Sequence, residues 1–215
     1  MKLHLGCGER YLQGYLNVDF PPEAHTVQCR SPADLHTDLL QMKYPIGSVD
    51  EIRLHHVFEH FIRPVACALL VAWYFWLKSG GILHLEVPDF VRTASVILNP
   101  VASSRAKAVA MRHLFGSHEA PWAVHCEGYT QGTLRGLLEQ VGFEVLEIHH
   151  NSWSGTHNIE MLVKKVGVIR TMDDLRARVR NLLGQYLVDV SEEPLLEAWM
   201  EIFDRQLHVS MGIDG

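Results

Sequence analysis

The sequence predicts an α/β protein with a doubly wound, mostly parallel sheet, a terminal pair of antiparallel strands and a C-terminal helical extension. An apolar strand over 49–54, an apolar helix over 65–77 and a second strand over 82–87 follow one another. This βαβ succession is typical of a parallel sheet with right-handed crossovers. Near the end of the chain, two further strands over 143–149 and 158–165 are adjacent in sequence, which predicts an antiparallel pair.

Local signals set the ends of the remaining elements. Residues 21–37 are rich in prolines and polar residues, which predicts a loop with one helical turn. The helix over 65–77 is followed by Ser79-Gly80-Gly81, a pattern that predicts a glycine C-cap. A later helix over 130–140 ends before Gly142, and the loop 151–157 joins the last two strands.

Bulk composition limits the class of protein. The 215 residues, 47% apolar and 20% charged, suit one domain over 1–166 with an extension over 167–215. A formal net charge of −6 argues against a nucleic-acid partner, since phosphate contacts need a basic surface. Four cysteines form no C-x-x-C pair, and no signal-peptide pattern is present, so we expect a cytoplasmic protein with reduced thiols. The apolar run 65–77 is too short to span a membrane.

The first twenty residues contain two predicted strands separated by a glycine-rich turn. Leu3 and Leu5 end a buried strand, Gly6 and Gly8 form the turn, and Asp19 ends the alternating second strand. Ligands of open α/β sheets bind beyond the carboxyl ends of the strands, where an acidic residue can accept hydrogen bonds from ribose hydroxyls. The pattern therefore predicts a site for a nucleoside-containing cofactor. The same residues also fit a glycine-rich turn beside an exposed aspartate.

A dinucleotide fingerprint is incomplete in this turn. G-x-G-x-x-G requires a third glycine, where this chain has Tyr11, and Gly14 comes too late. Asp19 comes too early for the acidic residue expected about 20 residues after the glycines. These departures disfavour a pyrophosphate cradle.

Six short motifs occur in order between residue 1 and about residue 165. They are residues 3–8, 16–19, Asp38-Leu39, 49–52 running into 56–60, 77–83, and 129–143. As an ordered set they resemble class I S-adenosylmethionine-dependent methyltransferases, and more narrowly a bacterial subgroup in which a short loop replaces most of the first helix. The resemblance implies a Rossmann-like sheet, S-adenosylmethionine as cofactor, and an acceptor from sugar, polysaccharide or secondary metabolism.

The resemblance also implies which residues bind the cofactor. They are Leu5, Gly6, Cys7 and Gly8 beside the methionine portion, Asp19 on the ribose, Asp38 and Leu39 at the adenine, and His55 and His56 on the far side. Taken without the resemblance, Asp38 equally predicts a helix cap.

Residues 91–128 form an insertion that, in the resembled family, covers the acceptor site. A helix is expected over 92–115, broken near Asn99-Pro100, before a polar loop over 116–130. We predict His125 as general base, because the pKa of histidine lies near physiological pH, with Trp122 and Tyr129 as an apolar wall. A loop held by local hydrogen bonds remains the alternative.

His60 is a second catalytic candidate, at the carboxyl end of a predicted strand. Glu59 and His60 also fit a purely structural role, capping the helix that begins near Arg63-Pro64.

The loop 116–130 contains residue types that bind metals. They are His118, His125, Cys126 and Glu127. There is no H-E-x-x-H motif, and the two histidines do not have i, i+4 spacing, so we predict no metal site. Whether His118 and His125 serve as bases, ligands or structural residues is left open by the spacing.

The sequence thus predicts methyl transfer from S-adenosylmethionine to a hydroxyl or amine of a small molecule. The alternatives are an NAD(P)-dependent oxidoreductase and a non-catalytic cofactor-binding subunit. The helical patterns over 168–215 carry no motif, and we expect them to pack on the sheet domain or to form a homodimer.

Overall fold

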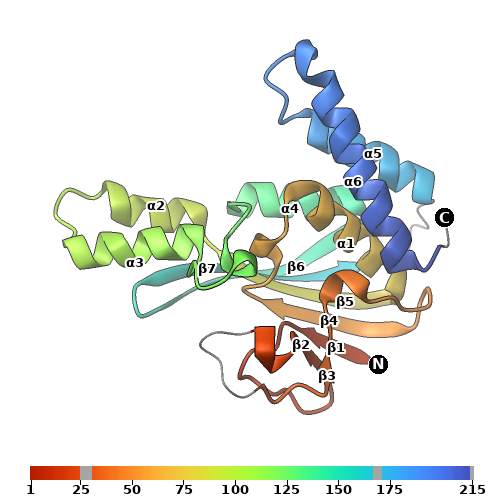
Figure 1. The fold of residues 1–215 in the computed structure, drawn as a ribbon, viewed down its shortest axis with the longest axis horizontal. Helices are drawn as coiled ribbons and strands as arrows, with labels where there is room; N and C mark the ends of the chain where they lie inside the picture. Colours follow the sequence, from red (N-terminus) through yellow and green to blue (C-terminus); the bar gives the residue numbers. More distant parts are fainter. Residues whose placement is uncertain (25–30, 167–170, 214–215) are drawn as a thin grey trace.

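The computed structural model describes residues 1–24, 31–166 and 171–213. Cys29, part of the predicted loop 21–37 and a few residues of the C-terminal extension lie outside these ranges. The described strands form one sheet in the order β3-β2-β1-β4-β5-β7-β6 (Figure 1). They are β1 (Lys2–Leu5), β2 (Leu16–Asp19), β3 (Leu35–His36), β4 (Val49–His55), β5 (Leu77–Pro88), β6 (Phe143–Trp153) and β7 (Thr156–Lys165).

Strand direction confirms the predicted fold class. The pairs among β1 to β5 are parallel, whereas β7 runs antiparallel to both of its neighbours, β5 and β6. The α-helices are α1 (Arg63–Trp76), α2 (Phe90–Leu98), α3 (Ser104–Phe115), α4 (Gln131–Val141), α5 (Met172–Gly184) and α6 (Glu193–Met211). Short 3₁₀ turns are η1 (Pro22–Ala24), η2 (Leu39–Gln41), η3 (Phe58–His60), η4 (Pro121–Ala123) and η5 (Val190–Glu192).

The segments that follow β1 and β2 contain no α-helix among the described residues. The turn 6–15 joins β1 directly to β2, and η1 is the one described helical turn before β3. The expected broken helix over 92–115 is present as α2 and α3, which lie side by side at one end of the molecule (Figure 1).

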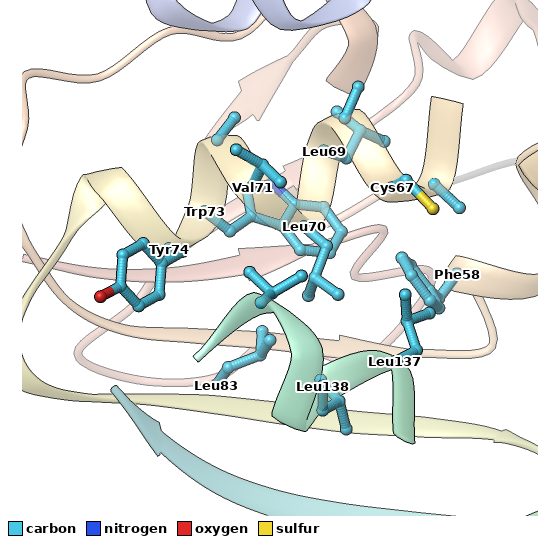
Figure 2. Packing of buried hydrophobic residues seen from close by; sticks show 14 of the residues in the cluster. Phe58, Cys67, Leu69, Leu70, Val71, Trp73, Tyr74, Leu83, Leu137 and Leu138 are labelled. Carbon is cyan, nitrogen blue, oxygen red and sulfur yellow. The ribbon is translucent and has the colours of Figure 1, made fainter. Parts of the chain in front are cut away.

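Helix α1 forms the centre of the hydrophobic core. Every residue from Ala66 to Tyr74 is at most 2% exposed, so the helix is buried on all sides. Leu137 and Leu138 of α4 face it, as does Leu83 of the sheet (Figure 2). Its remaining surface needs a further covering element.

The C-terminal helix α6 supplies that cover. Its buried side chains are Leu196, Met200, Phe203 and Leu207. The indole Nε1 of Trp76, at the end of α1, donates a hydrogen bond of 3.1 Å to the carbonyl of Ser210. The C-terminal helices therefore pack on the sheet domain, which is one of the two arrangements the sequence predicts.

The predicted glycine C-cap of α1 is wrong. The helix ends at Trp76, and Leu77 is already extended and paired with Val49 of β4. The pairing then shifts to Glu51 and Ile82, so Gly80 and Gly81 lie in an irregular stretch between the two registers. Gly80 has φ of +76°, and a Cβ on Gly81 would lie 2.9 Å from the carbonyl oxygen of Lys78. The glycines thus allow a bulge rather than a helix end.

Two other boundaries differ from prediction. The loop expected over 151–157 is a two-residue turn, Ser154-Gly155, with φ of 49° and 90°, so both strands of the hairpin are longer. Positive φ at both central residues matches the twist of an antiparallel pair. The two-residue strand β3 lies within the segment predicted as loop, because it is too short to leave a periodic pattern.

The packing predicts that α6 unfolds together with the sheet domain. Phe203→Ala removes a fully buried ring from the α1–α6 contact, and we expect the free energy of unfolding to fall by about 3–5 kcal/mol. Val209→Ala, on the more exposed side of α6, should change it by about 0.5 kcal/mol. Urea unfolding followed by circular dichroism measures both. A small effect of Phe203→Ala would show that the extension is not part of the core.

Candidate functional site

A cavity of about 680 Å³ lies at the carboxyl ends of β1, β2 and β4. This edge is where open α/β sheets bind ligands. Seven of the predicted cofactor-binding residues line it. They are Gly6, Gly8, Asp19, Asp38, Leu39, His55 and His56. The remaining lining includes residues the sequence analysis did not single out. They are Glu9, Phe20, Thr37, Leu40, Val57, Phe61, Arg112 and Glu119.

The glycine turn is fixed to the end of β2 by the carboxylate of Asp19. Its Oδ2 accepts a hydrogen bond of 2.6 Å from the amide of Gly8, and its Oδ1 accepts one of 2.7 Å from the amide of Phe20. Gly6 and Gly8 have φ of +64° and +56°, a region that L side chains rarely adopt. The turn therefore presents backbone to the cavity.

The side chains of Leu5 and Cys7 lie behind this wall. Neither is among the lining residues, and both are almost fully buried. Burial, with the nearby carboxylate of Asp19, raises the pKa of the Cys7 thiol to about 11. The structure therefore places their backbone, rather than their side chains, next to the turn that lines the cavity.

Asp38 fits both interpretations that its position in the sequence allows. Its Oδ1 accepts a hydrogen bond of 2.9 Å from the amide of Leu40, so it caps η2, and it also lines the cavity. The C-terminal extension supports this wall, because Gln206 Nε2 of α6 donates to the carbonyl of Leu40 at 2.8 Å.

The two histidines at the end of β4 have pKa values that are shifted in opposite directions. Burial lowers the pKa of His55 to about 4, and its Nε2 has no hydrogen-bond partner. At His56, burial opposes the charged form, but hydrogen bonds to Glu59 and Glu86 raise the pKa to about 10. His56 Nδ1 lies 3.2 Å from Glu59 and Nε2 lies 3.1 Å from Glu86. His56 is thus a cation held between two carboxylates.

The backbone at His56 is unusual for a residue with a side chain. Its φ is +54°, and its amide donates to the carbonyl of Glu86 at 2.9 Å. This conformation turns the chain away from the sheet at the cavity rim.

His60 and His125 lie in contact at one end of the cavity, with their ring centroids 4.7 Å apart. His60 is half-buried and lines the cavity. His125, the predicted base, is not a lining residue; its side chain is 10% exposed, and burial lowers its pKa to about 4. The structure therefore places His125 next to His60, with only His60 in the cavity wall.

The predicted apolar wall of the acceptor site is present in part. Trp122 lines the cavity, donates from Nε1 to the carbonyl of Ala24 at 2.9 Å, and lies against Phe20 at 6.0 Å between ring centroids. Tyr129 instead stacks on Phe58 at 5.4 Å and is buried in the core. Its assignment to the wall is wrong, because its ring points into the core.

The other candidate ligands of the loop 116–130 have separate surroundings. Glu127 Oε2 forms an ion pair with Arg63 Nε at 2.7 Å. His118 is exposed, and its Nε2 lies 2.9 Å from the carbonyl oxygen of Phe115. Cys126 is also exposed. Of the four candidate ligands His118, His125, Cys126 and Glu127, all of them described, His125 alone belongs to a group with ligand atoms close enough for one metal ion. No helix of the described chain has both the length and the apolar character to cross a membrane.

The close packing of Gly6 against Val57 predicts that a side chain at position 6 lowers the stability of the fold. A Cβ added there would lie 2.3 Å from Cγ2 of Val57, so Gly6→Ala should lower the free energy of unfolding by about 1–3 kcal/mol through overpacking. Gly14→Ala is a matched control, because Gly14 also has positive φ but nothing lies within 4 Å of its added Cβ. Both variants carry the cost of a left-handed residue, about 1–2 kcal/mol. Equal loss in the two, measured by urea unfolding, would contradict the tight contact.

Comparison with known proteins gives structural matches only. No protein-family model matches the sequence, and no curated protein matches it. A methyltransferase of Methanosarcina mazei is 14% identical, over 77% of this chain and 92% of that chain, with a TM-score of 0.52.

Two further solved structures extend this likeness. The 1,6-didemethyltoxoflavin-N1-methyltransferase of Burkholderia thailandensis, solved with S-adenosylhomocysteine, is 16% identical over 77% of this chain and 70% of that chain, with a TM-score of 0.51. A putative methyltransferase of Listeria monocytogenes is 12% identical over 76% of this chain and 90% of that chain, with a TM-score of 0.50. The chain therefore has the Rossmann-like α/β fold of S-adenosylmethionine-dependent methyltransferases.

Proposed function

We propose that the protein transfers a methyl group from S-adenosylmethionine to a hydroxyl or amine of a small molecule, such as a sugar or natural product. One observation carries this proposal. The glycine turn, Asp19 and Asp38 come from three separate segments, and all of them line one cavity at the carboxyl edge of the sheet. A fold shared with methyltransferases adds support, although one fold can host many functions.

The lining residues fit the cofactor. The space beside Gly8 is open, with nothing within 4 Å of an added Cβ, so the methionine portion could lie against the backbone there. At Gly6 the missing side chain instead makes room for Val57 of the cavity wall. Asp19 would hold the ribose hydroxyls, and Asp38 with Leu39 would contact the adenine. When bound, the cofactor supplies a methyl group on a sulfonium, and the neutral thioether that remains after transfer is a good leaving group.

The chain's own residues then have two tasks. They align the acceptor and exclude water, and they accept a proton where the nucleophile is a hydroxyl. His60 is placed for the second task, because its Nδ1 is 3.1 Å from the carbonyl of Val124, which leaves Nε2 as the acceptor. Trp122 and Phe20 supply the apolar wall beside it. In this proposal His125 supports His60 rather than touching the acceptor.

An NAD(P)-dependent oxidoreductase is disfavoured by two features. Dinucleotide sheets have the order 3-2-1-4-5-6, whereas here the antiparallel strand β7 lies between β5 and β6. The turn 6–15, all of it described, contains no helix whose N-terminus could bind a pyrophosphate. A non-catalytic cofactor-binding subunit has the same cavity and differs from an enzyme only in turnover.

Cytoplasmic location and a homodimer through α5 and α6 stay predictions. The connection between these helices exposes Val188 and Val190, which favours a contact with a second subunit.

The cofactor proposal is tested by calorimetric titration with S-adenosylhomocysteine and, separately, with NADH. We expect saturable binding of the first ligand only, weakened at least tenfold in Asp19→Ala because the ribose and the Gly8 amide both lose their acceptor. Asp34→Ala is the matched control, since Asp34 binds Asn17 next to the cavity without lining it. Preference for NADH would overturn the proposal.

A second substitution separates the two roles of Asp38. Asp38→Asn keeps an oxygen to cap the amide of Leu40 but removes one acceptor from the cavity. If Asp38 receives the adenine amine, S-adenosylhomocysteine should bind about tenfold more weakly while the thermal midpoint of unfolding stays unchanged. Unchanged affinity would leave Asp38 with the capping role alone.

A further inference from the structure

Three side chains at the end of the cavity bring ligand atoms together without a hydrogen bond among them. They are Glu59, His60 and His125, and one ligand atom of each lies within 4.8 Å of the other two. Glu59 Oε1 lies 3.9 Å from His125 Nε2. That distance is too long for a hydrogen bond. It is near the separation of about 3.4 Å that two ligands of a tetrahedral zinc ion have.

Two of the three side chains are buried with unpartnered atoms. Glu59 is fully buried, and its Oε2 has no hydrogen-bond partner, while Oε1 lies 3.2 Å from His56. The ring of His125 is nine-tenths buried, its Nδ1 has no partner, and its Nε2 faces the carboxylate of Glu59. A buried carboxylate oxygen normally has a partner, so the unpartnered Oε2 of Glu59, in the group with His60 and His125, points to a ligand.

The third side chain has the hydrogen bond that orients metal-binding histidines. His60 Nδ1 lies 3.1 Å from the carbonyl oxygen of Val124, which fixes the proton on Nδ1 and leaves the lone pair on Nε2. Metal-ligating histidines usually donate their second ring nitrogen to a carbonyl or carboxylate in this way.

The local charge also suits a cation. The carboxylates of Glu59 and Glu86 lie 3.2 Å and 3.1 Å from a single imidazole, that of His56, so two acidic groups share one basic partner. Glu119 adds a further carboxylate to the cavity lining, opposite in charge to Arg112.

We propose that Glu59, His60 and His125 bind a divalent transition-metal ion, with zinc as the best match. Two imidazoles and one carboxylate form the three-ligand set typical of open zinc sites. Because His60 lines the cavity, the remaining coordination position faces the space where the acceptor binds. With the Nε2 lone pair of His60 on the ion, His60 would no longer be the proton acceptor proposed above. An acceptor hydroxyl on the ion would instead lose its proton to solvent more readily than a free hydroxyl does.

A second group of ligand types is less suitable. His55, His84 and Glu160 also lie within 4.8 Å of one another, but Glu160 already accepts a hydrogen bond of 2.5 Å from His84 and lies 3.8 Å from the guanidinium of Arg53. The carboxylate of this group thus already has a histidine and a guanidinium as partners, although His55 Nε2 has none, and the group serves as a matched control.

The test uses untagged full-length protein treated with a chelator. Zn²⁺ is titrated by calorimetry, and Co²⁺ binding is followed by its visible absorption, with no cofactor or acceptor present. We expect one equivalent of Zn²⁺ and intense Co²⁺ bands typical of four-coordinate geometry. His60→Ala and His125→Ala should each weaken binding at least tenfold, whereas His84→Ala should bind as the wild type does. Circular dichroism verifies that each variant folds.

Each outcome decides the proposal. The expected pattern supports the site. Absence of stoichiometric Zn²⁺ binding in the wild type, unchanged affinity in both His60→Ala and His125→Ala, or loss confined to His84→Ala would overturn it. These readouts do not involve S-adenosylmethionine, so failure here leaves the methyltransferase proposal standing.

Discussion

The structure depends on one constraint, which is that helix α1 has no exposed face. An apolar helix of this kind must be covered on every side, because each exposed apolar side chain would cost the fold about 1.5–3 kcal/mol. The sheet and α4 cover part of α1, and α5 and α6 cover the rest. The C-terminal extension is therefore a structural requirement of the domain. It also reaches the functional edge, since Gln206 of α6 bonds the backbone of η2 in the cavity wall.

Among the described residues, loops rather than α-helices follow β1 and β2 at the edge of the cavity. A turn without its own helical hydrogen bonds needs other partners for its buried amides. Asp19 supplies two of them, and this interaction fixes both the glycine turn and the start of the next loop. The carboxylate of Asp19 is thus held in a fixed position in the cavity wall by two backbone amides.

Sequence patterns predicted the elements with strong periodicity or clear caps. Helix α4 begins at Thr130 with a capping box and ends at Gly142 in the left-handed conformation, as its residues indicate. The same glycine rule failed at Gly80 and Gly81, because β5 begins directly after α1 and a bulge requires glycine for a different reason. The strand β3 is too short to leave a pattern, and pairing with β2 alone defines it.

The cavity wall formed by the glycine turn and Asp19 was easier to predict than the wall contributed by α3 and the loop 116–130, for a physical reason. Gly6, Gly8 and Asp19 lie close together in sequence at strand ends, so local pattern and sheet topology suffice to place them. Trp122 was predicted in the wall and lines the cavity, whereas Arg112 and Glu119, which were not predicted, reach it only through the packing of α3 and the loop after it. No spacing rule describes that packing, and it also decides that Tyr129 points into the core.

The acceptor end has an electrostatic arrangement that burial alone would not maintain. Glu59 is fully buried, and a buried carboxylate needs compensating charge and hydrogen bonds. His56 supplies one charge and one hydrogen bond, from Nδ1 to Oε1 of Glu59, while its Nε2 contacts Glu86. The second oxygen of Glu59, Oε2, has no partner. A purely structural role would favour replacement of Glu59 by a neutral side chain of similar volume. A cation held by Glu59, His60 and His125 would remove this cost, because it would give the buried carboxylate the partner that it lacks.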